Sequence, residues 1–147
     1  MKLAIGCDNL AVDLKNQIIK TFTEKGHEFV DYGCFDASPI DYPDIGVQVA
    51  RAVASGEFAR GILICGTGIG MAITANKVKG CYAAVCHDVY STERSILSND
   101  ANVMCMGALV IGPATASTLV EKWLSLEFKA SPSLQKINKI KEIEQAE

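Results

Sequence analysis

Short apolar runs alternate along the chain with longer stretches in which apolar residues recur every three or four positions. A continuous apolar run is typical of a strand buried on both faces of a parallel sheet, and the longer spacing is typical of a helix that covers such a sheet. The pattern predicts five strands, at 2–7, 28–32, 61–65, 81–86 and 102–106. It predicts helices at 12–25, 43–54, 71–78, 90–97 and 113–126.

This order of elements predicts a Rossmann-like α/β fold, a three-layer sandwich with helices on both faces of a five-stranded parallel sheet. The length of 147 residues fits a single domain over 1–147. A C-terminal extension at 131–147 has isoleucines at 137, 140 and 143, a spacing typical of an amphipathic helix. The apolar stripe of this helix is expected to pack on a partner subunit of an oligomer or back on its own domain.

The composition narrows the range of partners. Hydrophobic residues make up 49% of the chain and charged residues 21%, which excludes a disordered chain. The net charge is −3 and no basic stripe is visible, so nucleic acid is not an expected partner. No apolar run approaches the roughly 18 residues of a membrane span, and the N-terminus is too polar for a signal peptide. These features predict a cytoplasmic protein with no membrane partner.

The six cysteines are predicted to be small buried side chains rather than disulfide or metal ligands. No CxxC or HxxxH spacing occurs, and His27 and His87 are the two histidines of the chain. We therefore expect no zinc site and no other metal cofactor.

Candidate chemistry gathers at the carboxyl ends of the predicted strands, where open parallel sheets bind ligands. The third strand ends at Cys65, and a glycine turn at 66–70 (Gly-Thr-Gly-Ile-Gly) leads into a helix. Successive amides in such a turn point at an anion, and the helix dipole adds to the attraction. The turn lacks the lysine of a Walker loop and the position and spacing of a dinucleotide fingerprint, which disfavours a nucleotide cofactor and an oxidoreductase.

Four side chains at this edge each allow a functional and a structural interpretation. Cys65 is either a thiolate stabilised by the helix dipole, able to act as a general base, or an inert buried thiol. Thr67 either holds an oxyanion or stabilises the turn. His87 follows the fourth strand and is either functional or structural. Asp8 either binds sugar hydroxyls or caps the next helix. Tyr42, in the loop before the second helix, is a further aromatic candidate for packing or ligand contact.

With these residues assembled, the chain resembles the family of type B ribose-5-phosphate isomerases and galactose-6-phosphate isomerase subunits. The resemblance covers about residues 1–128. The motifs that carry it are IGCD at 5–8, DYPD at 41–44, GILICGTGIGMAITANK at 61–77, CHDVYS at 86–91 and NDANVMCMG at 99–107. The motif at 61–77 is the most specific of them.

The resemblance implies a cofactor-free enzyme that interconverts phosphorylated aldoses and ketoses and forms dimers or tetramers. It implies that Cys65 moves a proton between C1 and C2 through a cis-enediolate. Thr67 and the backbone of the turn would hold the enediolate oxygens, as an oxyanion hole does. The substrate-binding positions implied by the resemblance are Asp8, Asn9, Tyr42, Gly66, Gly68, Ile69, Gly70 and Asn99. Met71 stands where some relatives have a glutamate base, which favours Cys65 in this chain.

The chain departs from the family at several positions. Asn9 replaces a histidine after the first strand, and Ser98 replaces the histidine that assists ring opening. Leu109 replaces one phosphate-binding arginine, and the Gly-Gly-Arg-His tail reads Lys-Ala-Ser-Pro-Ser at 129–133. The usual phosphate clamp and ring-opening acid are therefore absent.

Two explanations account for these departures. The substrate is either a short sugar phosphate with no ring to open, such as erythrulose 4-phosphate, or a second homologous subunit supplies the missing groups. In the first case His87 becomes the proton-relaying acid, and Arg94 or Lys129 meets the phosphate.

The leading expectation is a self-sufficient homodimer or homotetramer acting on a ribose 5-phosphate type of substrate. The alternatives are a tetrulose-phosphate isomerase, a galactose-6-phosphate isomerase subunit in a hetero-oligomer, and a non-catalytic sugar-phosphate-binding subunit.

Overall fold

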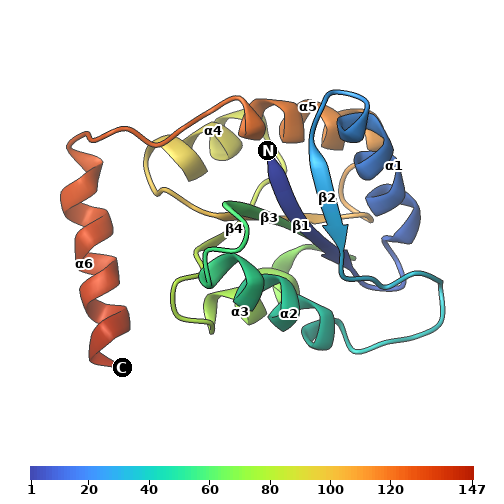
Figure 1. Cartoon of the computed structure of the whole chain (residues 1–147), viewed down its shortest axis with the longest axis horizontal. Coiled ribbons are helices and arrows are strands. Elements are labelled where there is room, and N and C mark those ends of the chain that lie inside the picture. The colour runs from blue at the N-terminus through green and yellow to red at the C-terminus, as the bar shows by residue number, and fades with distance from the viewer.

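The computed structural model describes all 147 residues. It contains one sheet of five parallel strands in the order β2-β1-β3-β5-β4 (Figure 1). The strands are β1 (Lys2–Cys7), β2 (Glu28–Asp31), β3 (Arg60–Cys65), β4 (Ala83–Val85) and β5 (Val103–Gly107). The fold class predicted from the apolar pattern is confirmed.

Helices cover both faces of the sheet. Figure 1 shows α1, α4 and α5 on one side and α2 and α3 on the other, with α6 apart from the rest at the β4 side. The helices are α1 (Val12–Thr23), α2 (Tyr42–Ala54), α3 (Ile69–Asn76), α4 (Val89–Leu97), α5 (Pro113–Leu124) and α6 (Ser133–Ala146). No helix combines the length and the apolar character that crossing a membrane requires.

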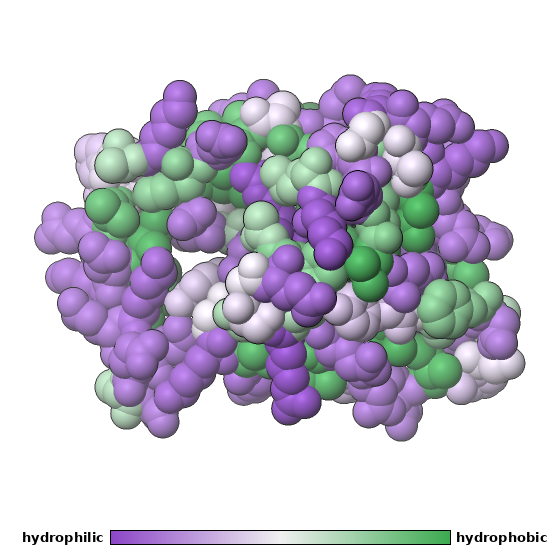
Figure 2. Space-filling model, in the orientation of Figure 1, coloured by the Kyte–Doolittle hydropathy of each residue, from purple (hydrophilic) through white to green (hydrophobic).

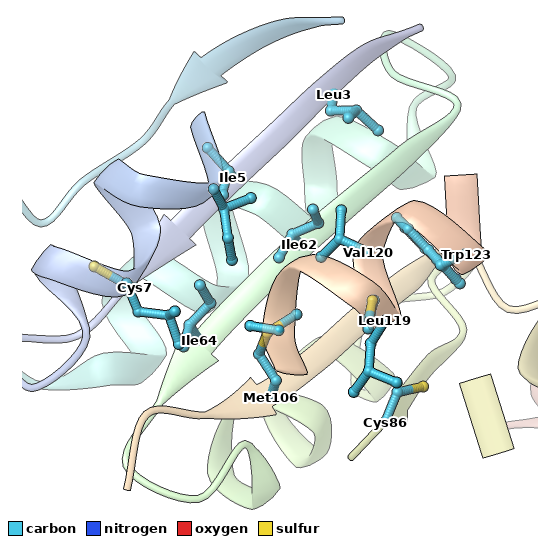
Figure 3. Packing of buried hydrophobic residues seen from close by; sticks show 14 of the residues in the cluster. Leu3, Ile5, Cys7, Ile62, Ile64, Cys86, Met106, Leu119, Val120 and Trp123 are labelled. Carbon is cyan, nitrogen blue, oxygen red and sulfur yellow. The ribbon is translucent and has the colours of Figure 1, made fainter. Parts of the chain in front are cut away.

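The sheet buries an apolar layer on each face. Every residue of β3 is buried, as its continuous apolar run predicts for a central strand. Ile62 and Trp123 belong to the cluster under α1, α4 and α5 (Figure 3). Leu63 and Met71 belong to the cluster under α2 and α3. Side chains that alternate along β3 thus supply both halves of the core, which fixes the strand register.

The strand register brings the loops of the candidate site to one edge. Cys7 of β1 pairs with Ile64 of β3, and Cys65 of β3 pairs with Gly107 of β5. The residues that follow these strand ends therefore meet at the carboxyl edge of the sheet.

The fourth strand is shorter than the apolar run at 81–86 predicts, and two asparagine side chains bond the backbone at its amino end. Asn76 donates to the carbonyl of Ala83 at 3.0 Å and accepts from the Ala83 amide at 2.8 Å. The Tyr82 amide donates to the side chain of Asn102 at 2.7 Å. These amide side chains satisfy backbone groups at the amino end of the edge strand.

All six cysteines are buried and form no disulfide, so the prediction of small buried thiols is confirmed.

The C-terminal helix α6 packs on its own domain along only part of its apolar stripe, and the rest of the stripe is exposed. Ile137 is buried and Glu144 accepts a hydrogen bond from the Tyr82 hydroxyl at 2.6 Å, whereas Ile140 and Ile143 stay exposed.

One buried charge is not evident from the sequence. Lys15 of α1 is fully buried and forms an ion pair with Asp31 at 2.7 Å. Its ammonium also donates to the carbonyl of Cys34 at 2.6 Å. The amide of Cys34 in turn donates to the carbonyl of Cys7 at 2.9 Å. Lys15 therefore fastens the loop between β2 and α2 to the end of β1.

Replacing this lysine tests its structural role. We expect Lys15→Met to lower the free energy of unfolding by about 3 kcal/mol, the lower end of the range for breaking a buried ion pair, because Asp31 keeps some access to water. Lys20→Met, on the exposed face of the same helix, is the matched control and should change it by less than about 0.5 kcal/mol. Urea unfolding followed by circular dichroism measures both, and equal losses would contradict the role of Lys15.

Candidate active site

The glycine turn at 66–70 packs directly on the end of β5. A side chain on Gly107 would lie 2.6 Å from the carbonyl oxygen of Gly66 and from the Cα of Thr67. The amide of Ala108 donates to the carbonyl of Cys65 at 2.8 Å, and the next amide along donates to that of Gly66 at 3.1 Å. The turn is thus held at backbone-to-backbone distance from the neighbouring strand.

Gly68 is the residue that shapes the turn. It has a φ of +81°, and a side chain there would lie 2.9 Å from the backbone carbon of Met106. Both features require glycine, and the helix α3 begins at the next residue, Ile69. This places the first amides of α3, with the positive end of its dipole, at the carboxyl edge of the sheet.

The sulfur of Cys65 lies inside this turn. The amide of Gly68 donates to Cys65 Sγ at 3.1 Å, and the Cys65 side chain retains 5% of its exposure. A hydrogen bond from an amide to a sulfur stabilises negative charge on that sulfur. The structure therefore places a thiol with anion-stabilising surroundings next to the backbone groups that the sequence marked as an oxyanion site.

His87 lies at the same edge and has a defined hydrogen-bonding state. The amide of Gly107 donates to His87 Nε2 at 2.8 Å, so Nε2 carries no proton and the neutral ring bears its proton on Nδ1. Burial lowers the pKa of His87 below its ordinary value, and the carboxylate of Asp88 opposes that shift. His87 is thus a neutral imidazole with one free N–H.

Asp8 is buried at the end of β1, with 7% of its surface exposed. Its Oδ1 accepts a hydrogen bond from the amide of Leu10 at 3.0 Å and makes no cap on α1, whose first residues carry no side-chain cap. Burial raises the pKa of Asp8, although hydrogen bonds from the backbone of Leu10 and Gly66 act in the opposite direction. The capping alternative for Asp8 is therefore not observed.

The remaining candidates at this edge frame the turn. The ring of Tyr42, the first residue of α2, lies against Gly70, where a side chain would collide with it. The hydroxyl of Thr67 is exposed and accepts from the amide of Ile69 at 3.2 Å. Asn9 lines a shallow hollow with Leu10 and the loop at 35–37.

Two exposed leucines at this edge have a packing role that the sequence analysis did not predict. Leu10 and Leu109 contact Gly66 from two sides, at 3.3 and 3.5 Å from the position of a side chain there. They are 55% and 74% exposed, respectively. The sequence signal that could have identified them is their position, since each leucine closely follows the motif at the end of a strand, IGCD for Leu10 and NDANVMCMG for Leu109. These leucines give the entrance to the turn apolar walls.

Asn99 lies elsewhere. It is exposed, and it stands in the connection between α4 and the amino end of β5. Cys65 is level with Gly107, at the carboxyl end of β5. The strand from Val103 to Gly107 spans about 13 Å at roughly 3.3 Å per residue. A single chain therefore brings Cys65, His87, Asp8 and Tyr42 to one edge and leaves Asn99 at the other.

Metal ligands are not grouped in this structure, since no three histidine, cysteine, aspartate or glutamate side chains are arranged to hold an ion.

Comparison with known proteins gives concordant results. The family model described as ribose/galactose isomerase matches residues 3–140. A ribose-5-P isomerase B of Listeria innocua is 50% identical over 99% of this chain and 98% of its own. A D-erythrulose-4-phosphate isomerase of Pectobacterium atrosepticum is 47% identical over 95% and 93%. The solved structure of Clostridium thermocellum ribose-5-phosphate isomerase B superposes with a TM-score of 0.97 at 43% identity, covering 99% of both chains.

Two substitutions test the backbone contact at Gly68. We expect Gly68→Ala to lower the free energy of unfolding by about 1–3 kcal/mol more than Gly26→Ala, because only the first forces a side chain into neighbouring backbone. Gly26 is the matched control, with a φ of +96° and open space around it. Urea unfolding measures both variants. Equal losses would show that the positive φ, and not the contact with Met106, requires glycine at position 68.

The state of His87 predicts a pH-dependent change at Gly107. The folded pKa of His87 is lowered, so the unfolded chain binds this proton at higher pH than the folded chain does. The contribution of neutral His87 to stability is therefore present above the ordinary pKa of about 6.5 and is lost as pH falls below it.

Protonation puts a second donor against the Gly107 amide and breaks their hydrogen bond. In ¹H–¹⁵N spectra we expect the Gly107 amide to shift with a midpoint below about pH 6.5. His87→Gln should abolish that titration. A Gly107 amide shift that does not change with pH in the wild-type protein would contradict the assigned hydrogen bond between Gly107 and His87.

Proposed function

The chain belongs to the ribose/galactose isomerase family of sugar-phosphate isomerases, and from this premise we propose that it interconverts ribose 5-phosphate and ribulose 5-phosphate with Cys65 as the base. The observation that carries the proposal is the Gly68 amide 3.1 Å from Cys65 Sγ, inside the glycine turn at the start of α3. The six buried free thiols suit a reducing compartment, and we propose a cytoplasmic location.

In the proposed reaction the Cys65 thiolate removes the proton from C2 of the aldose. The electron pair of that C–H bond forms the C1–C2 double bond, and the carbonyl oxygen on C1 becomes an oxyanion. The amides of the glycine turn and the Thr67 hydroxyl face this developing charge as an oxyanion hole. The thiol then returns the proton to C1, while the C2 hydroxyl becomes the carbonyl of the ketose.

The reaction also moves a proton from the C2 oxygen to the C1 oxygen, and two groups at the edge suit this transfer. His87 offers a free Nδ1–H while its other nitrogen is occupied by Gly107. Asp8 has a raised pKa, which suits a carboxyl group that exchanges protons. We assign the relay to His87, and we assign sugar-hydroxyl contacts to Asp8, Asn9 and Tyr42.

A second copy of the chain completes the proposed site, because Asn99 lies at the far edge of its own sheet. Ile69 and Ile73 of α3 are 56% and 58% exposed beside the glycine turn. They line a groove that shares Asn76 and Val85 with a cavity in which Asn99 lies. Twofold packing of these apolar faces would bring the turn of one copy towards Asn99 of the other. A homodimer or homotetramer, or a hetero-oligomer with a homologous subunit, meets this requirement.

Erythrulose 4-phosphate is the second candidate substrate, and Ser98 is the observation that favours it. The resemblance places a ring-opening histidine at this position. Ribose 5-phosphate closes a five-membered ring through its C4 oxygen. A tetrose 4-phosphate has that oxygen esterified and stays open, so its isomerisation requires no ring-opening acid. A 47% identical relative carries the name D-erythrulose-4-phosphate isomerase.

Removing the sulfur tests the function and its mechanism together. We expect Cys65→Ala to lower kcat by about 100- to 10,000-fold, the usual contribution of a general base, with its thermal stability retained. Cys81→Ala, another buried thiol, is the matched control and should keep wild-type turnover. A coupled assay with ribose 5-phosphate and with erythrulose 4-phosphate measures the rates and identifies the preferred substrate.

Two results would contradict the proposal. Full turnover in Cys65→Ala would remove the cysteine base. A wild-type protein that binds both sugar phosphates and turns over neither would indicate a non-catalytic binding subunit.

A further inference from the structure

A cavity of about 450 Å³ lies between the edge strand β4, the helix α4 and the helix α6. Figure 2 shows a hollow at this end of the molecule, between α6 and the rest of the chain. The wall formed by α6 is apolar and contains Ile137 and Ile140. The opposite wall is polar and contains Ser91 and Arg94 of α4 and Asn99, which lies just after that helix. This arrangement gives the cavity one cation on one side.

Arg94 is the arginine of this chain that is free to meet a ligand. The chain has three arginines. The guanidinium of Arg60 is buried and both of its terminal nitrogens donate to backbone carbonyls, those of Trp123 and Leu126. Arg51 lies on the exposed face of α2, away from any of the described cavities. Arg94 forms no ion pair with any carboxylate.

The guanidinium of Arg94 is oriented by Ser98. Its Nε donates to Ser98 Oγ at 2.8 Å, across one turn of α4. The terminal NH₂ groups make no hydrogen bond within the chain, so their donors remain available. A planar guanidinium held through its Nε and open at its terminal nitrogens suits two parallel hydrogen bonds to a phosphate.

We propose that Arg94, oriented by Ser98, binds the phosphate group of the sugar phosphate. This inference rests on the proposed function and deepens it, because it assigns the phosphate ligand that the chain otherwise lacks. Asn99 lines the same cavity and would supply a further polar contact. Ser98 thus serves as a positioning residue for Arg94.

Arg94 serves the site of a second copy rather than its own. Within one chain, β5 and β4 separate β3, which ends in Cys65, from the cavity outside β4. Arg94 is tied to Ser98 at the end of α4, towards the amino ends of the strands. The groove formed by the exposed face of α3 shares Asn76 and Val85 with the cavity, so a second copy packed on that face would bring its glycine turn towards Arg94.

Arg94→Met is the first test, and Arg51→Met is the matched control on an exposed helix face. We expect Arg94→Met to lower kcat/KM for the preferred sugar phosphate by about 10- to 100-fold, mainly through KM, since charged hydrogen bonds to the phosphate are lost. Arg94→Lys should recover part of the loss, because a lysine keeps the charge without the paired donors. Arg51→Met should keep wild-type kinetics. Unchanged KM in Arg94→Met would overturn the assignment.

Mixing two inactive or slow variants tests the sharing between copies. Cys65→Ala and Arg94→Met chains, denatured and refolded together, should give activity well above either variant refolded alone, because each mixed dimer holds one complete site. If Arg94 served its own chain, every mixed site would lack one group and the mixture would gain nothing. That result would overturn the shared arrangement.

Calorimetric titration with inorganic phosphate separates this inference from the proposed function. We expect the wild-type protein and Arg51→Met to bind phosphate, and Arg94→Met to bind it about 10-fold or more weakly. If the wild-type protein isomerises neither sugar phosphate, the proposed function fails, but this titration still shows whether Arg94 binds phosphate. Equal phosphate affinity in Arg94→Met and the wild-type protein would overturn the site.

Discussion

The packing of the glycine turn against the end of β5 is the contact on which the candidate site depends. Gly68 meets the backbone of Met106, and Gly107 meets the backbone of Thr67, so neither position has room for a side chain. The first contact holds the Gly68 amide at the sulfur of Cys65, and the second fixes the amide that binds His87. These two backbone-to-backbone contacts therefore set the relative positions of the proposed base, oxyanion hole and imidazole.

Burial at this edge has an electrostatic consequence as well as a packing one. Loss of water raises the pKa of Asp8 and lowers the pKa of His87, so both groups favour their neutral forms more than free side chains do. In the proposed reaction the amide dipoles of the turn, and not charged side chains, act on the developing oxyanion. Lys15 also stabilises this edge, because its ammonium binds Asp31 and the carbonyl of Cys34 and so holds the loop that leads to Tyr42.

The order of elements was predictable because continuous apolar runs report burial on both faces, and β3 meets that condition along its whole length. The glycine turn was predictable because its signal is local. The hydrogen bond between Gly107 and His87 was not predictable, since it depends on the pairing of two strands that are separated in sequence. The burial of Lys15 was hidden for a similar reason, because a helical lysine usually faces solvent. Asn99 was identified by resemblance alone, which carries no information about which copy it serves.

The distribution of positive charge links the site to substrate length. The proposed reaction uses backbone dipoles, and no lysine or arginine, at the reacting carbons. A phosphate group, with about −2 charge near neutral pH, favours a fixed cation. In the proposed arrangement that cation is Arg94 of a second copy, and Cys65 and the phosphate ligand belong to different chains. The distance between them, and with it the choice between four- and five-carbon substrates, is then set by how the two copies pack. Residues of the subunit interface that touch no substrate would thereby determine specificity.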